Sequence, residues 1–183
     1  MVKENNKVIY GSEIGIILGV NKNKNIKELY LEKINKAPRD NKNLKLNNEE
    51  VYWMNTLKEL LSKEFTIRSG KKVRKELKTI VDEEYDFMNS KVDKRIVGEN
   101  SILLCITSRG DIMKSEIDEN TFLECQHNMR VTKADKCYVG CLINDKRFYF
   151  KEILRDETVI DKIVKAEKAF FYNHILREIL PSE

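Results

Sequence analysis

Apolar residues recur at helical spacing most clearly between Asn48 and Ser69. The stripe consists of Val51, Met54, Leu57, Leu60, Leu61 and Phe65. A stripe of this period lets one face of an α-helix pack on a core. Tyr52 and Trp53 belong to the same pattern, so we expect them in the core rather than on the surface as a stacking platform. Gly70 follows, and because glycine commonly ends a helix, the sequence predicts one long amphipathic helix here.

Shorter helical patterns lie at both ends of the chain. Ser12 is a suitable N-cap for a first helix, which Gly19 ends, and Asn25 is a suitable N-cap for a second. A final helix is predicted from about Asp156 to Leu180, with Pro181 after its end.

Strand patterns fill most of the middle of the chain. The segment from Lys71 to Gly98 alternates between apolar and polar residues, and Ile102 to Ile106 is an apolar run typical of a buried strand. "KCYVGCLI" and "RFYFKEIL" are two more strands, and Asn144-Asp145 between them suits a tight hairpin. A helix from about Thr121 to Ala134 precedes them. This order predicts an α/β fold with a central mixed sheet flanked by helices, in a single domain over residues 1–183.

Composition places the chain among globular proteins. Hydrophobic residues make up 41% and charged residues 35%, and a length of 183 residues suits one self-folding domain. The apolar runs are far shorter than the roughly 20 residues that a membrane-spanning helix needs. The amino terminus also lacks the apolar region of a secretory signal. We therefore expect a cytoplasmic protein of the host cell that makes no membrane contact.

The four cysteines are Cys105, Cys125, Cys137 and Cys141. In an intracellular protein, cysteines are usually reduced. Their spacing, and the distance to the nearest histidine, His127, fit no zinc motif. We expect four buried thiols and no metal–thiolate site.

The net charge of +4 permits nucleic-acid binding without requiring it. The densest positive run, "GKKVRKE", contains Lys71, Lys72, Arg74 and Lys75. One interpretation of this run is a solvated loop. The other is a strip that follows a phosphate backbone, in which case binding should weaken steeply as salt increases.

Four blocks of sequence carry a family resemblance. They are "GSEIGIILGVNKNKNIKELYLEK", "YWMNTLKELLSKEF", "FMNSKVDKRIVGENSILLCITS" and "CQHNMRVTKADKCYVGCLINDKRFYFKEILRDETVIDKIVKAEKAFF". In this order they resemble the YqaJ viral recombinase family, a branch of the phage lambda-type exonucleases in the PD-(D/E)-x-K nuclease superfamily. The resemblance extends from about Ile9 to Phe171. It implies the restriction-endonuclease-like core of that superfamily.

The resemblance also implies a set of catalytic positions. The superfamily holds divalent cations with carboxylates, and a lysine helps to activate water. Its aspartate matches Asp93, whereas its acidic-x-Lys triplet falls on Cys105 and Thr107 and its helix glutamate falls on Lys58. Its Gln-x-Gln pair falls on Glu124 and Gln126, so only the second glutamine is kept.

These departures change what the resemblance predicts about activity. A thiol and a hydroxyl do not replace hard anionic ligands of Mg²⁺, and losing several catalytic groups together lowers rates by orders of magnitude. We therefore expect a pseudonuclease without a cofactor, and an ion pair between Lys58 and Asp93 across the former metal site. In the alternative, an exonuclease with a relocated site, Mg²⁺ would be held with help from Glu59, Asp111 or Glu116.

Three functions stay open. A binding protein would act on a protein partner, such as a host defence effector, as an anti-CRISPR inhibitor does. A DNA-binding recombination accessory would use Lys71 to Lys75 and work beside a recombination protein. The relocated-site exonuclease would cleave DNA. The oligomeric state is open in all three.

Overall fold

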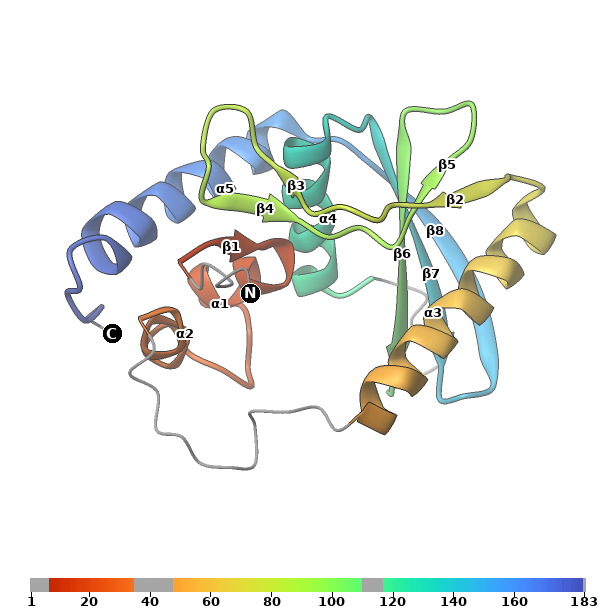
Figure 1. Ribbon diagram of the computed structural model, residues 1–183, viewed down its shortest axis with the longest axis horizontal. Helices are drawn as coiled ribbons and strands as arrows, with labels where there is room; N and C mark the ends of the chain where they lie inside the picture. The colour runs from red at the N-terminus through yellow and green to blue at the C-terminus, as the bar shows by residue number, and fades with distance from the viewer. Residues whose placement is uncertain (1–6, 35–47, 110–116, 183) are drawn as a thin grey trace.

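A five-stranded mixed sheet with helices on both faces forms one half of the molecule (Figure 1). The computed structural model describes residues 7–34, 48–109 and 117–182. The strand order is β2-β5-β6-β7-β8. The strands are β2 (Val73–Lys75), β5 (Lys94–Ile96), β6 (Ser101–Ser108), β7 (Lys136–Ile143) and β8 (Arg147–Leu154). The β6 and β7 strands are parallel, and the other neighbours are antiparallel, so the predicted mixed sheet is confirmed.

A smaller sheet and most of the remaining helices form the other half (Figure 1). This sheet has the order β1-β4-β3, with bounds Ile9–Tyr10, Met88–Ser90 and Ile80–Val81 respectively. The helices of the chain are η1 (Gly11–Glu13), α1 (Ile14–Ile17), α2 (Ile26–Lys33), α3 (Asn48–Ser69), α4 (Glu119–Thr132), α5 (Glu157–Phe170) and the π-helical turn η2 (Phe171–Ile175).

The two faces of the five-stranded sheet are covered by different helices. On one face, Leu61 and Phe65 of α3 pack against Leu103 of β6. On the other face, Cys125 and Met129 of α4 pack against Ile102, Leu104 and neighbouring apolar residues. Alternate residues of β6 therefore enter opposite cores, as the two-residue period of a strand requires. Because both faces are buried, the continuous apolar run of this strand is explained.

Several local predictions from the sequence are confirmed. Asn144 and Asp145 have φ values of 50° and 58°, which a two-residue hairpin of the primed type requires. The Asn25 side chain accepts a hydrogen bond from the Glu28 backbone and caps α2. Gly70 has a φ of 71° and follows α3 directly. All four cysteines are buried free thiols. These features depend on residues close together in the chain.

Three predictions about helices are wrong. Ser12 lies inside η1 and is not an N-cap. The last α-helix ends at Phe170, and a π-helical turn replaces its predicted continuation to Leu180. Tyr52 and Trp53 are 60% and 53% exposed. The reason is that α3 contributes to the core under the sheet only through its second half, with Leu61 and Phe65. The first half of the helix contributes no residue to this core, so Tyr52 and Trp53 are exposed to solvent.

Candidate functional site

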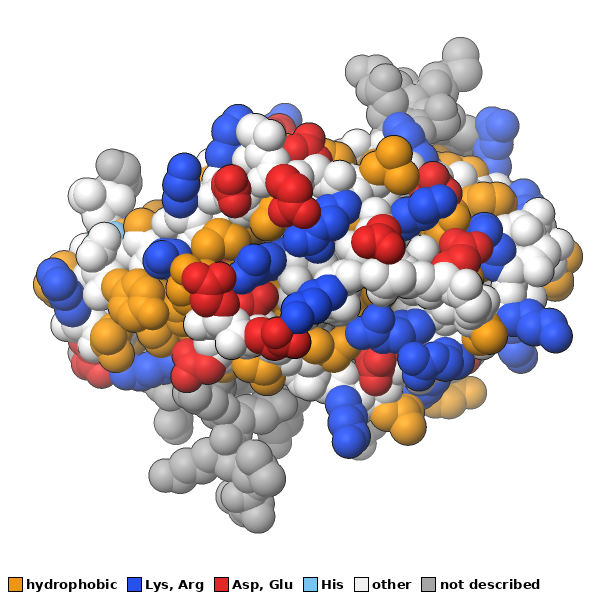
Figure 2. Space-filling view, turned by 90° about the horizontal axis from the view of Figure 1, so that it is seen from above, with side chains coloured by type: hydrophobic (Ala, Val, Ile, Leu, Met, Phe, Trp, Pro, Cys, Tyr) orange, Lys and Arg blue, Asp and Glu red, His pale blue; other side chains and the backbone are white. Residues whose placement is uncertain are grey.

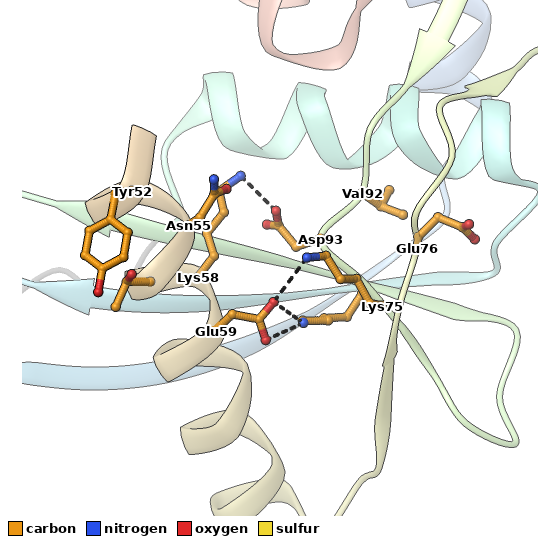
Figure 3. Close-up of a pocket in the computed structure, with 10 residues that line it drawn as sticks. Tyr52, Asn55, Lys58, Glu59, Lys75, Glu76, Val92 and Asp93 are labelled. Carbon is orange, nitrogen blue, oxygen red and sulfur yellow. Dashed lines mark hydrogen bonds and ion pairs between the residues drawn. The ribbon is translucent and has the colours of Figure 1, made fainter. Parts of the chain in front are cut away.

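A cleft of about 390 Å³ lies between the first half of α3 and strands β2 and β5 (Figure 3). Its lining residues come from three places: Tyr52, Asn55, Thr56, Lys58 and Glu59 from α3, Lys75 and Glu76 from β2 and the residue after it, and Val92, Asp93 and Lys94 from β5 and the residues before it. Charged side chains of both signs therefore face one another across this cleft.

Asp93 lies in the cleft immediately before β5. Its Oδ1 atom accepts a hydrogen bond of 2.8 Å from Lys58 Nζ, so the expected ion pair is present. Its Oδ2 atom accepts a hydrogen bond of 2.8 Å from the backbone N–H of Cys105 on β6. The Asp93 side chain is 11% exposed and that of Lys58 is 38% exposed. Asp93 thus joins α3 to the centre of the sheet, and both of its oxygens have protein partners.

A second ion pair runs beside the first with its charges reversed. Lys94 Nζ lies 2.6 and 2.7 Å from the two carboxylate oxygens of Glu59. The hydrogen bond from Lys94 holds the pKa of Glu59 below its usual value, although burial opposes this shift. Lys75 Nζ is 3.8 Å from the same carboxylate (Figure 3). Two consecutive residues of α3 therefore bind two consecutive residues at the start of β5, in two adjacent ion pairs of opposite polarity.

Cys105 and Thr107, the two strand positions predicted from the resemblance, have different surroundings. Cys105 is 3% exposed and packs in the core below α3. Burial, and then the nearby Asp93 charge, raise the pKa of its thiol to about 12. The thiol is therefore protonated near neutral pH and is neither a nucleophile nor a metal ligand there. Thr107 is exposed near the end of β6.

Gln126 does not lie with the other predicted site residues. Its side-chain amide donates to the Leu154 carbonyl and accepts from the Asp156 backbone N–H, each at 2.9 Å, so it ties the end of β8 to the start of α5. Glu124, the other residue of this pair, is buried close enough to Asp93 and Lys58 for their charges to affect it. Burial raises its pKa, and the Asp93 charge adds to the increase. Residues two apart on an α-helix point about 200° away from each other around its axis. Only one of Glu124 and Gln126 can therefore face Asp93.

The predicted basic run does not form one continuous strip. Lys71 is paired with Glu99 and lies over the Tyr138 ring, 5.4 Å from its centroid. Lys72 and Arg74 are exposed, but Arg74 points to the opposite side of β2 from Lys75 because strand residues alternate. Lys75 is the member of the run that lines the cleft. Figure 2 shows acidic side chains interspersed among the basic ones across one face of the molecule.

Several lining residues of the cleft were not predicted from the sequence. Asn55 and Thr56 were not singled out, and Lys94 was overlooked as the partner of Glu59. Tyr52 was placed in the core. A usable signal was present, because Tyr52, Asn55, Thr56 and Glu59 are spaced at i, i+3, i+4 and i+7, which puts them on one face of α3.

The family resemblance implies a divalent cation, and the described residues alone supply no complete set of ligands for one. Within residues 7–34, 48–109 and 117–182, no three acidic, histidine or cysteine side chains converge on a point where they could hold a metal ion. Asp93 is already bonded to an ammonium group and a backbone N–H. Asp111 and Glu116, two of the expected substitutes, lie outside the described residues. We derive no chemical step through a metal.

The helices were compared with the requirements for a membrane-spanning segment. In the described part of the chain, none of them combines the length and the apolar character needed to cross a bilayer.

Comparison with known proteins places this fold and cleft in a family. Residues 3–135 match the model of the YqaJ-like viral recombinase domain. The uncharacterized protein YqaJ of Bacillus subtilis is 38% identical over 179 residues, which are 94% of this chain and 55% of that protein. The chain therefore belongs to the YqaJ-like viral recombinase family, and it spans about half the length of this curated relative.

Solved structures share the fold at low sequence identity. An alkaline exonuclease from Laribacter hongkongensis has a TM-score of 0.69 and 12% identity, covering 95% of this chain and 90% of its own. A phage-related exonuclease from Haemophilus somnus 129PT has a TM-score of 0.65 and 16% identity, covering 93% and 96% respectively. The nuclease-like fold predicted from the sequence is thus confirmed.

The expectation that the chain is not an enzyme is wrong. The alkaline exonuclease and the phage-related exonuclease named above share its fold, and its family is one of viral recombinases. No feature of the described residues shows inactivity. The substitutions at Lys58, Cys105 and Thr107 alter the arrangement of the site without assigning the chain to a non-enzymatic class.

Proposed function

We propose that this chain binds and processes DNA in viral recombination, with the cleft between α3 and β5 as its DNA site. The observation that carries the proposal is the place of Asp93. This residue lies in a cleft beside Lys58 and Lys75, within a fold that exonucleases share. The family assignment supports DNA as the substrate, because the matching domain is described as a viral recombinase.

The side chains of the cleft suit a phosphate backbone. The side chains of Lys58 and Lys75 are 38% and 62% exposed, so a phosphate can approach both. Each has a carboxylate neighbour that holds it at the cleft in the absence of DNA. A phosphate that bonds to Lys58 competes with Asp93 for the same ammonium group, and DNA binding thereby loosens the Lys58–Asp93 pair.

The experiment measures binding and cleavage together. Linear duplex and single-stranded DNA are incubated with the protein and Mg²⁺ or Mn²⁺, and with the Asp93→Ala variant. We expect binding that weakens between 50 and 200 mM salt, and release of nucleotides that Asp93→Ala abolishes. Asp161→Ala, which changes an exposed aspartate on α5, is the matched control. Binding without cleavage contradicts the processing step, and the absence of both overturns the proposal.

A protein partner remains a prediction of the sequence. The viral recombinase family favours a recombination protein over a host defence effector, because the described residues hold no feature that selects such an effector. Co-purification of the chain with recombination proteins of the same virus, at physiological salt, tests this part.

A further inference from the structure

An exposed aromatic ring forms one wall of the charged cleft. Tyr52 is 60% exposed and lines the cleft (Figure 3). Its ring meets that of Trp53 edge to face, with centroids 5.5 Å apart and planes at 75°, and Trp53 is itself 53% exposed. Aromatic side chains usually bury most of their surface. Two adjacent exposed rings at a polar cleft indicate a surface that contacts a ligand.

The rest of this helix face offers polar groups that suit a base edge. Asn55 and Thr56 follow Tyr52 by three and four residues, so their amide and hydroxyl lie on the same face of α3 and line the same cleft. An amide presents both a hydrogen-bond donor and an acceptor, and a hydroxyl can do either. The ring and these groups together provide a flat apolar surface with adjoining polar partners.

The opposite wall offers one cation that is little engaged. Lys75 Nζ is 3.8 Å from Glu59, near the outer limit of an ion pair, and its side chain is 62% exposed. The Lys94 side chain, in contrast, is 7% exposed and directly bonded to the same carboxylate. A phosphate can therefore approach Lys75 without breaking a short ion pair.

We propose that this cleft binds one nucleotide of single-stranded DNA, with its base stacked on Tyr52, its base edge beside Asn55 and Thr56, and its phosphate beside Lys75. This inference rests on the proposed function and names the form of DNA that the same cleft accepts. The cleft volume of about 390 Å³ lies in the range of small-ligand sites. A base inside a duplex is stacked between its neighbours, so a single strand or an unpaired end presents the face that Tyr52 needs.

Trp53 supplies the readout. It is the only tryptophan of the sequence, and its ring touches that of Tyr52. An oligothymidine strand and a blunt duplex of equal length are titrated into the protein without a divalent cation, and Trp53 fluorescence and affinity are followed. We expect the single strand to quench Trp53 and to bind more tightly than the duplex. Tyr52→Ala should weaken single-strand binding by about tenfold, the usual effect of losing one stacked base.

Two further variants make the test specific. Tyr52→Phe keeps the ring and should retain wild-type affinity. If the hydroxyl group of Tyr52 were the binding group instead, Tyr52→Phe would lose affinity as Tyr52→Ala does. Tyr172→Ala removes an exposed tyrosine in η2, in the other half of the molecule from the cleft (Figure 1), and should leave affinity unchanged. Thermal unfolding of each variant confirms that it is folded.

The outcomes separate this inference from the proposed function. If wild type and Tyr52→Ala bind the single strand equally well, or if the duplex binds as tightly as the single strand, the stacking site is overturned while DNA binding stands. If the protein binds neither DNA at low salt, the proposed function itself fails, and the inference fails with it.

Discussion

Two ion pairs of nearly equal length lie in contrasting surroundings. Lys58 and Asp93 approach to 2.8 Å in the cleft, with side chains 38% and 11% exposed. His127 of α4 and Glu167 of α5 approach to 2.9 Å, and both are fully buried. A half-exposed pair can exchange its partner for solvent or a ligand, whereas a buried pair has no replacement partner if one member is lost. Solvent access, rather than length, therefore decides whether such a pair can exchange its partner.

The buried pair holds its proton tightly. Burial opposes the charge on His127, but the nearby Glu167 carboxylate raises the pKa of the imidazole above its usual value. Burial also raises the pKa of Glu167, partly offset by His127. His127 is further fixed by a contact of 2.9 Å between its Nε2 atom and the Asn89 carbonyl. This network joins α4, α5 and β4, so its main effect is on stability.

The largest effect is expected from breaking the buried pair. Glu167→Ala should lower the free energy of unfolding by about 3–5 kcal/mol, because it leaves a buried imidazole without its charged partner and creates a cavity. Urea unfolding measures the loss. Asp161→Ala, an exposed acidic residue on the same helix, should change stability by less than about 0.5 kcal/mol. Equal losses in the two variants would show that burial does not set the cost of removing a carboxylate from this helix.

A smaller loss is expected at the half-exposed pair. Asp93→Ala should cost about 1–3 kcal/mol, because the Cys105 backbone N–H loses its acceptor while Lys58 can turn to water. Asp93→Asn keeps an oxygen for that N–H and should recover part of the loss. Chemical unfolding of the three proteins checks the order. A loss for Asp93→Ala as large as that for Glu167→Ala would contradict the comparison.

The pH dependence of stability should reveal the buried pair. The folded-state pKa of His127 lies above its unfolded value of 6.5, so its contribution is fully present below pH 6.5 and is lost as the pH rises through the folded value. The raised pKa of Glu167 acts in the same direction from its unfolded value of 4.5 upward.

Unfolding measured in urea from pH 6 to 9 tests this direction. We expect the stability difference between wild type and His127→Gln to shrink as the pH rises. A difference that grows with pH would show that His127 is neutral in the folded protein.

The smallest effect is expected at a surface pair on α3. Arg68 Nε lies 2.5 Å from Glu64 one helical turn away, with side chains 48% and 36% exposed. Glu64→Gln should cost about 0.2–0.5 kcal/mol, and less in 1 M salt, because water screens such a pair. Unfolding at low and high salt measures this. A loss above about 1 kcal/mol would mean that exposure is a poor guide to the value of an ion pair in this protein.

Prediction from the sequence succeeded where neighbours in the chain decide the outcome. The β7–β8 hairpin has the predicted strands and turn, and α3 has the predicted bounds. The predicted burial of Tyr52 and Trp53 was wrong. Helical periodicity marks the apolar face of a helix, but it does not say along how much of the helix the sheet covers that face. Prediction from the sequence also grouped Gln126 with Asp93, although Gln126 binds the start of α5.

The candidate site was predicted in part. The ion pair between Lys58 and Asp93 was expected from their positions in the family pattern, and the structure brings them together across 35 residues of sequence. The second pair, Glu59 with Lys94, was not expected, because nothing in the local sequence of either residue points to the other.

By itself, the sequence determined the long helix α3, the strands β7 and β8 with the turn at Asn144-Asp145, and the family. Backbone preference and side-chain periodicity act over a few residues, and family blocks can be compared position by position. Only the tertiary structure decided which side chains meet in the cleft, that Tyr52 is an exposed wall and that Gln126 lies elsewhere. Those outcomes depend on how far each helix overlaps the sheet, and this overlap is set by the packing of distant segments rather than by any local pattern.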